Sequence, residues 1–371
     1  MKGKLQLARS LSLNEAVRIT KMKYWSYSSM WVKSVKVLLL LTMVPALYGQ
    51  INLEDGGLAP SEFERVGMSG FQFLKIQTDA RMAALGGMRT AMSRGDAASA
   101  LYNPASMVDV KNLGFGFTQM SYIGDVKYFA VSLVKDLDNW GVLGLNIIQL
   151  DYGDITRTYW GVDERLNPIP VTDGTYSGGD LALGLSYGRQ VTDRLQLGGT
   201  FRQISETLDS RDNISTSVWA LDIGTVYYTG LSSLRIAMLG SNFGPDAEFV
   251  DFDDRLGILP VQVQLPAMFS LGAAYDFFDD DGSRQLLTVA AEFVHPNDGP
   301  EKVHCGAEYS LLDMLSLRGG YRFNYDEDGL SLGAGLKVSV ANRNTIEIDY
   351  AFMDFGRLGA LSMFTLVYDW D

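Results

Sequence analysis

The chain of 371 residues has few of the side chains on which disulfide frameworks, metal sites and most catalytic sites depend. It contains one cysteine, Cys305, and two histidines, His295 and His304. A single cysteine excludes an intramolecular disulfide and a zinc site built from several cysteines. The histidines have no further ligands at matching spacing and no nucleophile motif beside them, so we predict no metal site, no cofactor and no catalytic residue.

Long hydrophobic runs are scarce as well. One stands near the N-terminus, over residues 37–47, and follows Lys33 and Lys36. About 11 residues are too few for a membrane-spanning helix, which needs about 20. A short apolar run between basic residues and the small Gly49 is typical of a secretory signal peptide, which we assign to residues 1–49.

Positive charge is the third property in short supply. The formal net charge is −13, and loss of residues 1–49 would remove eight Lys or Arg and one Glu, which makes it −20. Nucleic-acid binding depends on clustered Lys and Arg, so we expect no nucleic-acid partner.

Glycine, aromatic residues and a two-residue alternation are abundant instead. The chain has 39 Gly, 18 Tyr and 18 Phe, and in runs such as 181–188 large apolar residues alternate with Ala, Gly and Ser. A period of two is the signature of a strand, and the runs have the length that a tilted strand needs to cross a bilayer. Fourteen such runs occur, at 113–122, 126–135, 140–150, 179–190, 195–207, 216–229, 233–240, 267–277, 285–294, 302–311, 314–324, 329–340, 344–354 and 359–370.

The connections between these runs indicate a membrane barrel. Those after even-numbered runs are short, whereas two after odd-numbered runs, 151–178 and 241–266, are long. Outer-membrane barrels have short periplasmic turns and longer extracellular loops. Soluble β-sandwiches fit less well, because their strands average about 5 to 6 residues and their second face is charged. We therefore predict an all-β fold, a 14-stranded antiparallel transmembrane barrel over residues 112–371, in contact with the lipid of a Gram-negative-type outer membrane.

The segment before the first strand is rich in Ala and Gly. We interpret residues 50–111 as a periplasmic lead-in followed by a plug inside the barrel. Residues 80–85 can form a short helix that Gly86 ends, and Asn103 before Pro104 is a turn signal that leads into the first strand.

Several charged residues fall at inward positions of the predicted strands. A Lys or Arg that faces lipid at mid-depth costs about 2–4 kcal/mol, so we expect these side chains to point into the lumen. There they should pair with one another and with Arg81, Arg89 or Asp96 of the plug. Acidic clusters at 279–281 and 326–328 precede glycine, and we interpret them as hairpin turns rather than calcium sites. The inward charges are Glu292, Glu308, Arg318, Arg322, Lys337, Glu347 and Asp349.

An ordered set of plug residues carries a family resemblance. It includes Phe73, Arg81, Gly86, Gly87, Asp96, Asn103, Pro104 and Ala105. Over about 35 residues this order resembles the N-terminal signature of the PorV/PorQ family, relatives of the FadL outer-membrane barrels. The strands that follow cover the rest of the chain.

The resemblance implies a component of type IX protein secretion. Such a protein would bind the large translocon barrel, the C-terminal sorting domains of secreted cargo, or both. The long connections 151–178 and 241–266 would then be the contact surfaces, and the first carries Tyr152, Tyr159, Trp160 and Tyr176, aromatic residues of the kind enriched at interfaces.

Two alternatives remain open from the sequence. A FadL-like transporter of hydrophobic small molecules would have a lateral opening, a kinked strand and an apolar pocket near the plug. Phe71, Phe73, Leu74 and Met82 could line that pocket or simply pack. A paralogue with a structural role in the envelope is the other alternative, because the signature residues do not separate the three.

Overall fold

A computed structural model describes residues 67–92, 95–249, 262–278, 284–340 and 344–370. The predicted signal peptide, most of the predicted lead-in and the acidic cluster at 279–281 lie outside the described residues. None of the described helices has the length and apolar content needed to cross a membrane.

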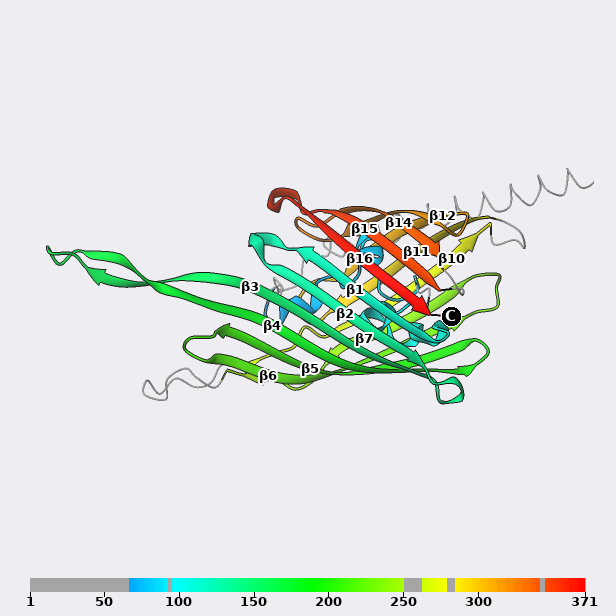
Figure 1. Cartoon of the computed structure of the whole chain (residues 1–371), viewed down its shortest axis with the longest axis horizontal. Coiled ribbons are helices and arrows are strands. Elements are labelled where there is room, and N and C mark those ends of the chain that lie inside the picture. The colour runs from blue at the N-terminus through cyan, green and yellow to red at the C-terminus, as the bar shows by residue number, and fades with distance from the viewer. Residues whose placement is uncertain (1–66, 93–94, 250–261, 279–283, 341–343, 371) are drawn as a thin grey trace, which may run out of the picture. The chain divides into compact units, whose positions relative to one another are not determined.

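Fourteen antiparallel strands close into a barrel (Figure 1). Each strand pairs with its neighbours in sequence, β7 pairs with β10, and β1 closes the ring against β16. The predicted number of strands is confirmed. The strands are β1 (Leu113–Ser121), β2 (Lys127–Asp136), β3 (Val142–Val162), β4 (Pro168–Thr192), β5 (Leu195–Asp209), β6 (Ile214–Tyr228), β7 (Arg235–Phe243), β10 (Met268–Phe277), β11 (Gln285–Pro296), β12 (Lys302–Leu311), β13 (Leu315–Phe323), β14 (Leu330–Ser339), β15 (Thr345–Asp354) and β16 (Ala360–Trp370).

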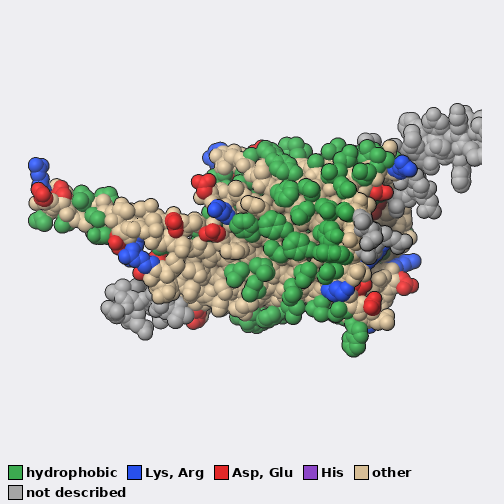
Figure 2. Space-filling model, in the orientation of Figure 1, with side chains coloured by type: hydrophobic (Ala, Val, Ile, Leu, Met, Phe, Trp, Pro, Cys, Tyr) green, Lys and Arg blue, Asp and Glu red, His purple; other side chains and the backbone are tan. Residues whose placement is uncertain are grey.

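The alternation along the strands separates lipid-facing from lumen-facing side chains. In β13, Leu315 and Leu317 are exposed on the outer wall, whereas Ser316 and Arg318 are buried in the lumen. Apolar side chains cover much of the outer wall, and charged ones gather toward its ends (Figure 2). Large side chains on the outside and polar or small ones inside reverse the arrangement of a water-soluble protein, so this wall faces lipid.

The segment before β1 folds inside the barrel. It consists of η1 (Gln72–Lys75), α2 (Ala80–Ala84), α3 (Ser99–Tyr102) and η2 (Pro104–Asp109). Helix α2 lies against β13 to β16, and η2 lies against β3 to β6 on the other side of the lumen. We call residues 69–110 the plug.

Glycines of the wall allow the plug to approach the strands closely. A Cβ atom on Gly320 would lie 2.1 Å from the backbone nitrogen of Gly86, and one on Gly198 would lie 2.4 Å from that of Ala105. Real Cβ atoms do not come so near, so side chains larger than hydrogen would push the plug off the wall. The plug therefore fills the lumen in direct contact with the backbone of the barrel.

The expected long loop at 151–178 is instead regular structure. β3 and β4 continue past the end of the other strands as a two-stranded hairpin that projects from the barrel (Figure 1). The reason is local, because β-branched residues such as Ile155, Thr158 and Val171 favour strands. We call residues 152–162 and 168–178 the arm. In the other expected loop, β8 (Ala247–Glu248) pairs with β9 (Gln262–Val263), while residues 250–261 are not described.

Candidate functional site

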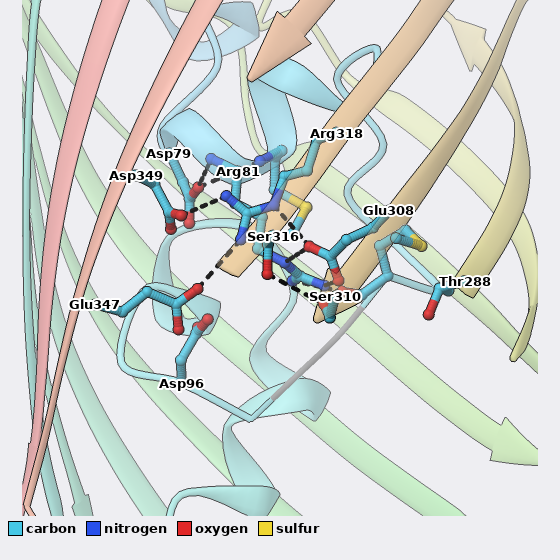
Figure 3. A network of polar contacts seen from close by, with 12 residues as sticks. Asp79, Arg81, Asp96, Thr288, Glu308, Ser310, Ser316, Arg318, Glu347 and Asp349 are labelled. Carbon is cyan, nitrogen blue, oxygen red and sulfur yellow. Dashed lines mark hydrogen bonds and ion pairs between the residues drawn. The ribbon is translucent and has the colours of Figure 1, made fainter. Parts of the chain in front are cut away.

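A network of buried charges joins the plug to the wall (Figure 3). Arg81 of α2 donates from Nε to Glu308 Oε2 of β12 at 2.8 Å, and from Nη1 to the carbonyl oxygen of Met92 at 2.7 Å. Arg318 of β13 donates to the same Glu308 oxygen at 2.6 Å and also binds Asp349 and, at 3.2 Å, Glu347. The structure thus brings together Arg81 and four of the charges predicted to face inward.

A second carboxylate fixes another part of the plug. Glu292 Oε2 of β11 accepts hydrogen bonds from the backbone nitrogens of Arg89 and Thr90 at 2.8 and 2.9 Å, and from the Thr90 hydroxyl at 2.7 Å. The Arg89 guanidinium turns back to the plug and donates to the carbonyl oxygen of Lys75 at 2.7 Å. Plug and wall are therefore connected by directional bonds as well as by close packing.

Asp79 caps helix α2 from a buried position. Its carboxylate accepts from the backbone nitrogens of Arg81 and, at 3.2 Å, Met82. Burial, reinforced by the charges of Asp96 and Asp349, raises the pKa of Asp79 to about 7. The carboxyl group that caps helix α2 therefore changes its protonation state near neutral pH.

The residues that carry the family resemblance have packing and capping positions in the plug. Asp96 Oδ1 accepts from the Ser99 backbone nitrogen at 3.1 Å, and Asn103 Oδ1 accepts from that of Ala105 at 3.1 Å. Pro104 occupies the first turn of η2. Phe73, Arg81, Asn103, Pro104 and Ala105 are buried, and Gly86 and Gly87 have φ of +73° and +75°.

A cavity of about 490 Å³ lies between the plug and the loops that connect the strands at the end of the barrel from which the arm projects. Of the eight plug residues named above for the family resemblance, only Gly87 is among its described lining residues. Phe71, Phe73, Leu74 and Met82, considered above as pocket residues, are buried and do not line it. These four side chains pack the plug. The apolar lining consists of Ile76, Met120, Met268, Val294, Met353, Phe355, Leu358, Leu361 and Met363.

The apolar lining was not predicted from the sequence. Its signal was present, because Met120, Met353 and Met363 stand at inward positions of β1, β15 and β16 where small or polar residues are usual in this chain. Methionine is flexible and adapts to ligands of differing shape. A methionine at an inward strand position beside a plug is therefore the pattern that would have located the cavity.

Other residues that line the cavity are polar or charged. Asp298, in the loop between β11 and β12, accepts from Lys75 Nζ at 2.6 Å and from Gln72 Nε2 at 3.0 Å. Burial works against the charged form, but the hydrogen bonds from Lys75, Ser69 and Gln72 prevail and lower the pKa of Asp298. Arg322 donates to the Gly86 carbonyl oxygen and to Asp328, and its buried Nη2 has no hydrogen-bond partner among the described residues. The cavity thus combines an apolar wall with charged groups.

The barrel wall is irregular where the cavity reaches β7. Pairing between β6 and β7 shifts from Leu221 opposite Phe243 to Ile223 opposite Gly240, which leaves an extra residue in β7. Asn242 in this bulge has φ of +62°. Its backbone nitrogen donates to Asp222 Oδ1 at 2.7 Å. Ser241 beside it, with Met268 and Ser270 of β10, lines the cavity, so the cavity ends at the irregular part of the wall.

The four aromatic residues predicted as a partner-binding loop are not equivalent. Tyr159 and Trp160 are exposed on the arm by 54% and 76%. Tyr152, at the base of the arm, donates its hydroxyl to Asp180 at 2.6 Å, and the half-buried Tyr176 stands opposite Ile155. Two of the four side chains are therefore well exposed, and the other two are held at or near the base of the arm.

The histidines remain apart from any metal-like cluster. His304 is buried and its Nε2 lies 2.9 Å from the Tyr325 hydroxyl, while His295 is exposed near Glu301. Among the residues described, no group of three or more His, Cys, Asp or Glu is arranged to hold a metal ion. Asp328 and Glu327 of the second acidic cluster pair with Arg322 and Arg357.

Comparison with known proteins concerns the fold. No protein-family model matches the chain, and no curated protein matches it in sequence. The toluene transporter TbuX of Ralstonia pickettii has a similar structure, with a TM-score of 0.51 and 15% identity over 80% of this chain and 98% of that one. The CymD monoaromatic hydrocarbon channel has a TM-score of 0.50 and 12% identity over 79% and 97%. A FadL homologue of Pseudomonas aeruginosa also matches, at 0.48 and 13% over 80% and 98%, a likeness too weak to argue from.

At these identities the likeness establishes architecture only. The chain is a closed 14-stranded antiparallel barrel, as the sequence predicts, and shares this fold with the solved barrels TbuX and CymD. The apolar outer wall and this fold agree with the predicted location in an outer membrane of the Gram-negative type.

Proposed function

We propose that the barrel carries hydrophobic small molecules across the outer membrane. The observation that carries this proposal is the cavity, which has a partly apolar lining, is bounded by a tightly packed plug, and reaches the bulge in β7. Its volume of about 490 Å³ falls in the range of about 300–1,000 Å³ that is usual for small-molecule sites. Solved barrels of this fold include a toluene transporter and a monoaromatic hydrocarbon channel, which supports hydrophobic substrates.

The plug argues for a sideways exit. It touches the backbone of the wall at Gly198 and at Gly320, on two sides of the lumen, so it obstructs the way along the barrel axis from the cavity. Where the cavity reaches β7, in contrast, the bulge interrupts the pairing of β7 with β6, and the pairing of β7 with β10 ends at Ser241 and Met268. We therefore place the exit into the membrane at this end of the β7–β10 seam.

A disulfide across the seam tests this route. Ser241 and Met268 are directly opposite in β7 and β10, at a separation that a disulfide can bridge. In a Cys305→Ala background, Ser241→Cys with Met268→Cys should reduce toluene uptake by cells at least about fivefold when oxidised, and reduction should restore it. The matched control is Met120→Cys with Met363→Cys, which lines the same cavity but joins β1 to β16. Equal uptake by both double-cysteine variants, oxidised and reduced, or equal inhibition by both disulfides, would rule out the seam as the exit.

A second proposal follows the plug resemblance and the arm. A PorV-like role in type IX secretion would use the arm to contact the translocon barrel or the sorting domain of cargo, and the exposed Tyr159 and Trp160 favour such a contact. The test compares the full chain with a shortened chain in which Asn-Gly replaces residues 154–177. Each protein carries a tag ahead of residue 67 and is used in pull-downs from detergent-solubilised outer membranes. The full chain should recover a much larger barrel or cargo with sorting domains, and the shortened chain should not. Recovery of the barrel alone in both cases would contradict the secretion role.

A further inference from the structure

The arm exposes surfaces that a two-stranded hairpin rarely keeps in water. Beyond Asp151, β3 pairs only with β4 among the described residues. Trp160 faces Pro170 on one side of the arm, and Tyr159 faces Val171 on the other, so both sides are apolar. Isolated hairpins of two strands are marginally stable, and a third strand is the usual remedy.

The two edges of the arm differ. The β4 edge is partly covered by the turn between β5 and β6, where the Ser210 nitrogen donates to the Ser177 carbonyl oxygen at 2.9 Å and Arg211 donates to that of Asp173 at 2.8 Å. Farther out, β4 contains Pro168 and Pro170. Prolines on an edge strand prevent the addition of another strand, because they lack the N–H group.

The ladder shows where the backbone groups of β3 point. The Asp163 nitrogen donates to the Asn167 carbonyl oxygen at 2.9 Å, which makes this a hydrogen-bonded pair. Such pairs alternate with non-hydrogen-bonded ones, so the pairs Val162–Pro168, Trp160–Pro170 and Thr158–Thr172 turn their backbone groups outward. In β4 two of these positions are proline. In β3 all three keep both N–H and C=O groups on the open edge.

We propose that the outer edge of β3 from Thr158 to Val162 accepts an extended segment of a partner polypeptide as an added strand outside the membrane. Backbone hydrogen bonds to Thr158, Trp160 and Val162 hold the segment. Its apolar side chains, at alternate positions, cover the Trp160 and Tyr159 sides of the arm. The inference rests on the second proposed function, for which it specifies how a partner is held, and it is independent of transport.

The probe is a photoreactive benzoylphenylalanine at position 158 of the whole protein, in cells that make it. Thr172 is the matched control, because it belongs to the same pair but its backbone groups face the β4 edge, so it stands one strand farther from the added segment. Irradiation should give an adduct with a partner segment from position 158 and not from 172. A synthetic peptide of that segment should then bind the purified protein in detergent. Its affinity should be about tenfold lower for the Thr158→Pro variant and within about twofold of the unchanged protein for the Thr172→Pro variant. Two further peptides carry N-methyl groups on every second amide, one on the odd-numbered and one on the even-numbered amides. The peptide whose methylated amides would face β3 should not bind, and the other should bind.

The outcomes separate this inference from the function on which it rests. An adduct whose peptide binds Thr158→Pro as well as the unchanged protein overturns strand addition and leaves a side-chain contact with the partner. Equal adducts from both positions, or an adduct with a second copy of this chain, also overturn it. If position 158 gives no adduct and the full chain recovers no secretion partners in pull-downs, both proposals are overturned.

Discussion

Arg81 and Arg318 share one carboxylate inside the barrel. Both donate to Glu308 Oε2, and all three side chains are at most 2% exposed. Charges removed from water are tolerated only when each is paired and hydrogen-bonded, and loss of one partner leaves an uncompensated charge. The shared carboxylate is therefore the residue on which this contact between plug and wall depends most.

Glu308→Gln should lower the free energy of unfolding by about 3–5 kcal/mol, because two buried guanidinium groups then lose their common counter-charge. Urea unfolding of the barrel in detergent measures the change. Glu327→Gln is the control, since Glu327 pairs with Arg357 at the surface, where ion pairs contribute little. A similar loss for both variants would show that the buried network contributes no more to the free energy of unfolding than a surface ion pair does.

Asp79 couples the plug to pH. Burial and the charges of Asp96 and Asp349 raise its pKa to about 7 in the folded chain, above the ordinary value of about 4 for an exposed carboxyl, so the folded state binds more protons between these values. The contribution of Asp79 to stability is then fully present below about pH 4 and is lost as the pH rises through about 7. Hydrogen exchange of the α2 amides, corrected for intrinsic rates, should accelerate from pH 5 to pH 8.

Asp79→Asn should remove that acceleration, because the amide keeps an oxygen for the Arg81 and Met82 nitrogens but carries no charge. The same pH slope in both proteins would assign the effect to another group.

At the scale of elements, the plug depends on glycines in strands that face it. Gly320 is buried against the plug, whereas its neighbour Gly319 faces outward, where a Cβ would meet only Leu332 at 3.6 Å. The two positions are adjacent in one strand and differ only in the side of the wall that they face.

Gly320→Ala should destabilise the barrel by about 1–3 kcal/mol and make the plug sensitive to protease, because the added carbon collides with Gly86. Gly319→Ala should leave both properties unchanged. Limited proteolysis and planar-bilayer conductance measure plug displacement, and equal behaviour of the two variants would contradict a plug held by wall glycines.

The strands were predictable because lipid and lumen impose opposite demands on successive residues. β14, predicted at 329–340, spans Leu330–Ser339, and inward charges such as Glu308 and Arg318 were found for the same reason. Which charges pair was not predictable, because Glu308 meets Arg318 through the register of β12 and β13. Tyr152 likewise turns to Asp180, a partner 28 residues away, and the bulge at Asn242 has no local signature.

At the scale of the whole barrel, the cavity and the arm belong to the same end but use different parts of the wall. The cavity lining comes from the plug, β1, β7, β10 to β13, β15 and β16 and the loops between them, whereas the arm extends from β3 and β4. Barrel closure does not involve the arm, because β2 pairs with β3 as far as Asp151 and β4 pairs with β5 from Gly179 onward. One barrel can therefore combine a small-molecule path with a separate surface for a protein partner.

Shortening the arm separates these two functions. Replacement of residues 154–177 by Asn-Gly keeps Tyr152 and its bond to Asp180, so the outer end of the lumen should retain its structure. We expect toluene uptake within about twofold of the full chain and an unchanged urea midpoint, because the removed residues do not line the cavity and bond to the turn between β5 and β6 rather than to the ring of paired strands. Loss of uptake in a chain that still unfolds at the same midpoint would instead place the arm on the transport path and join the two functions in one.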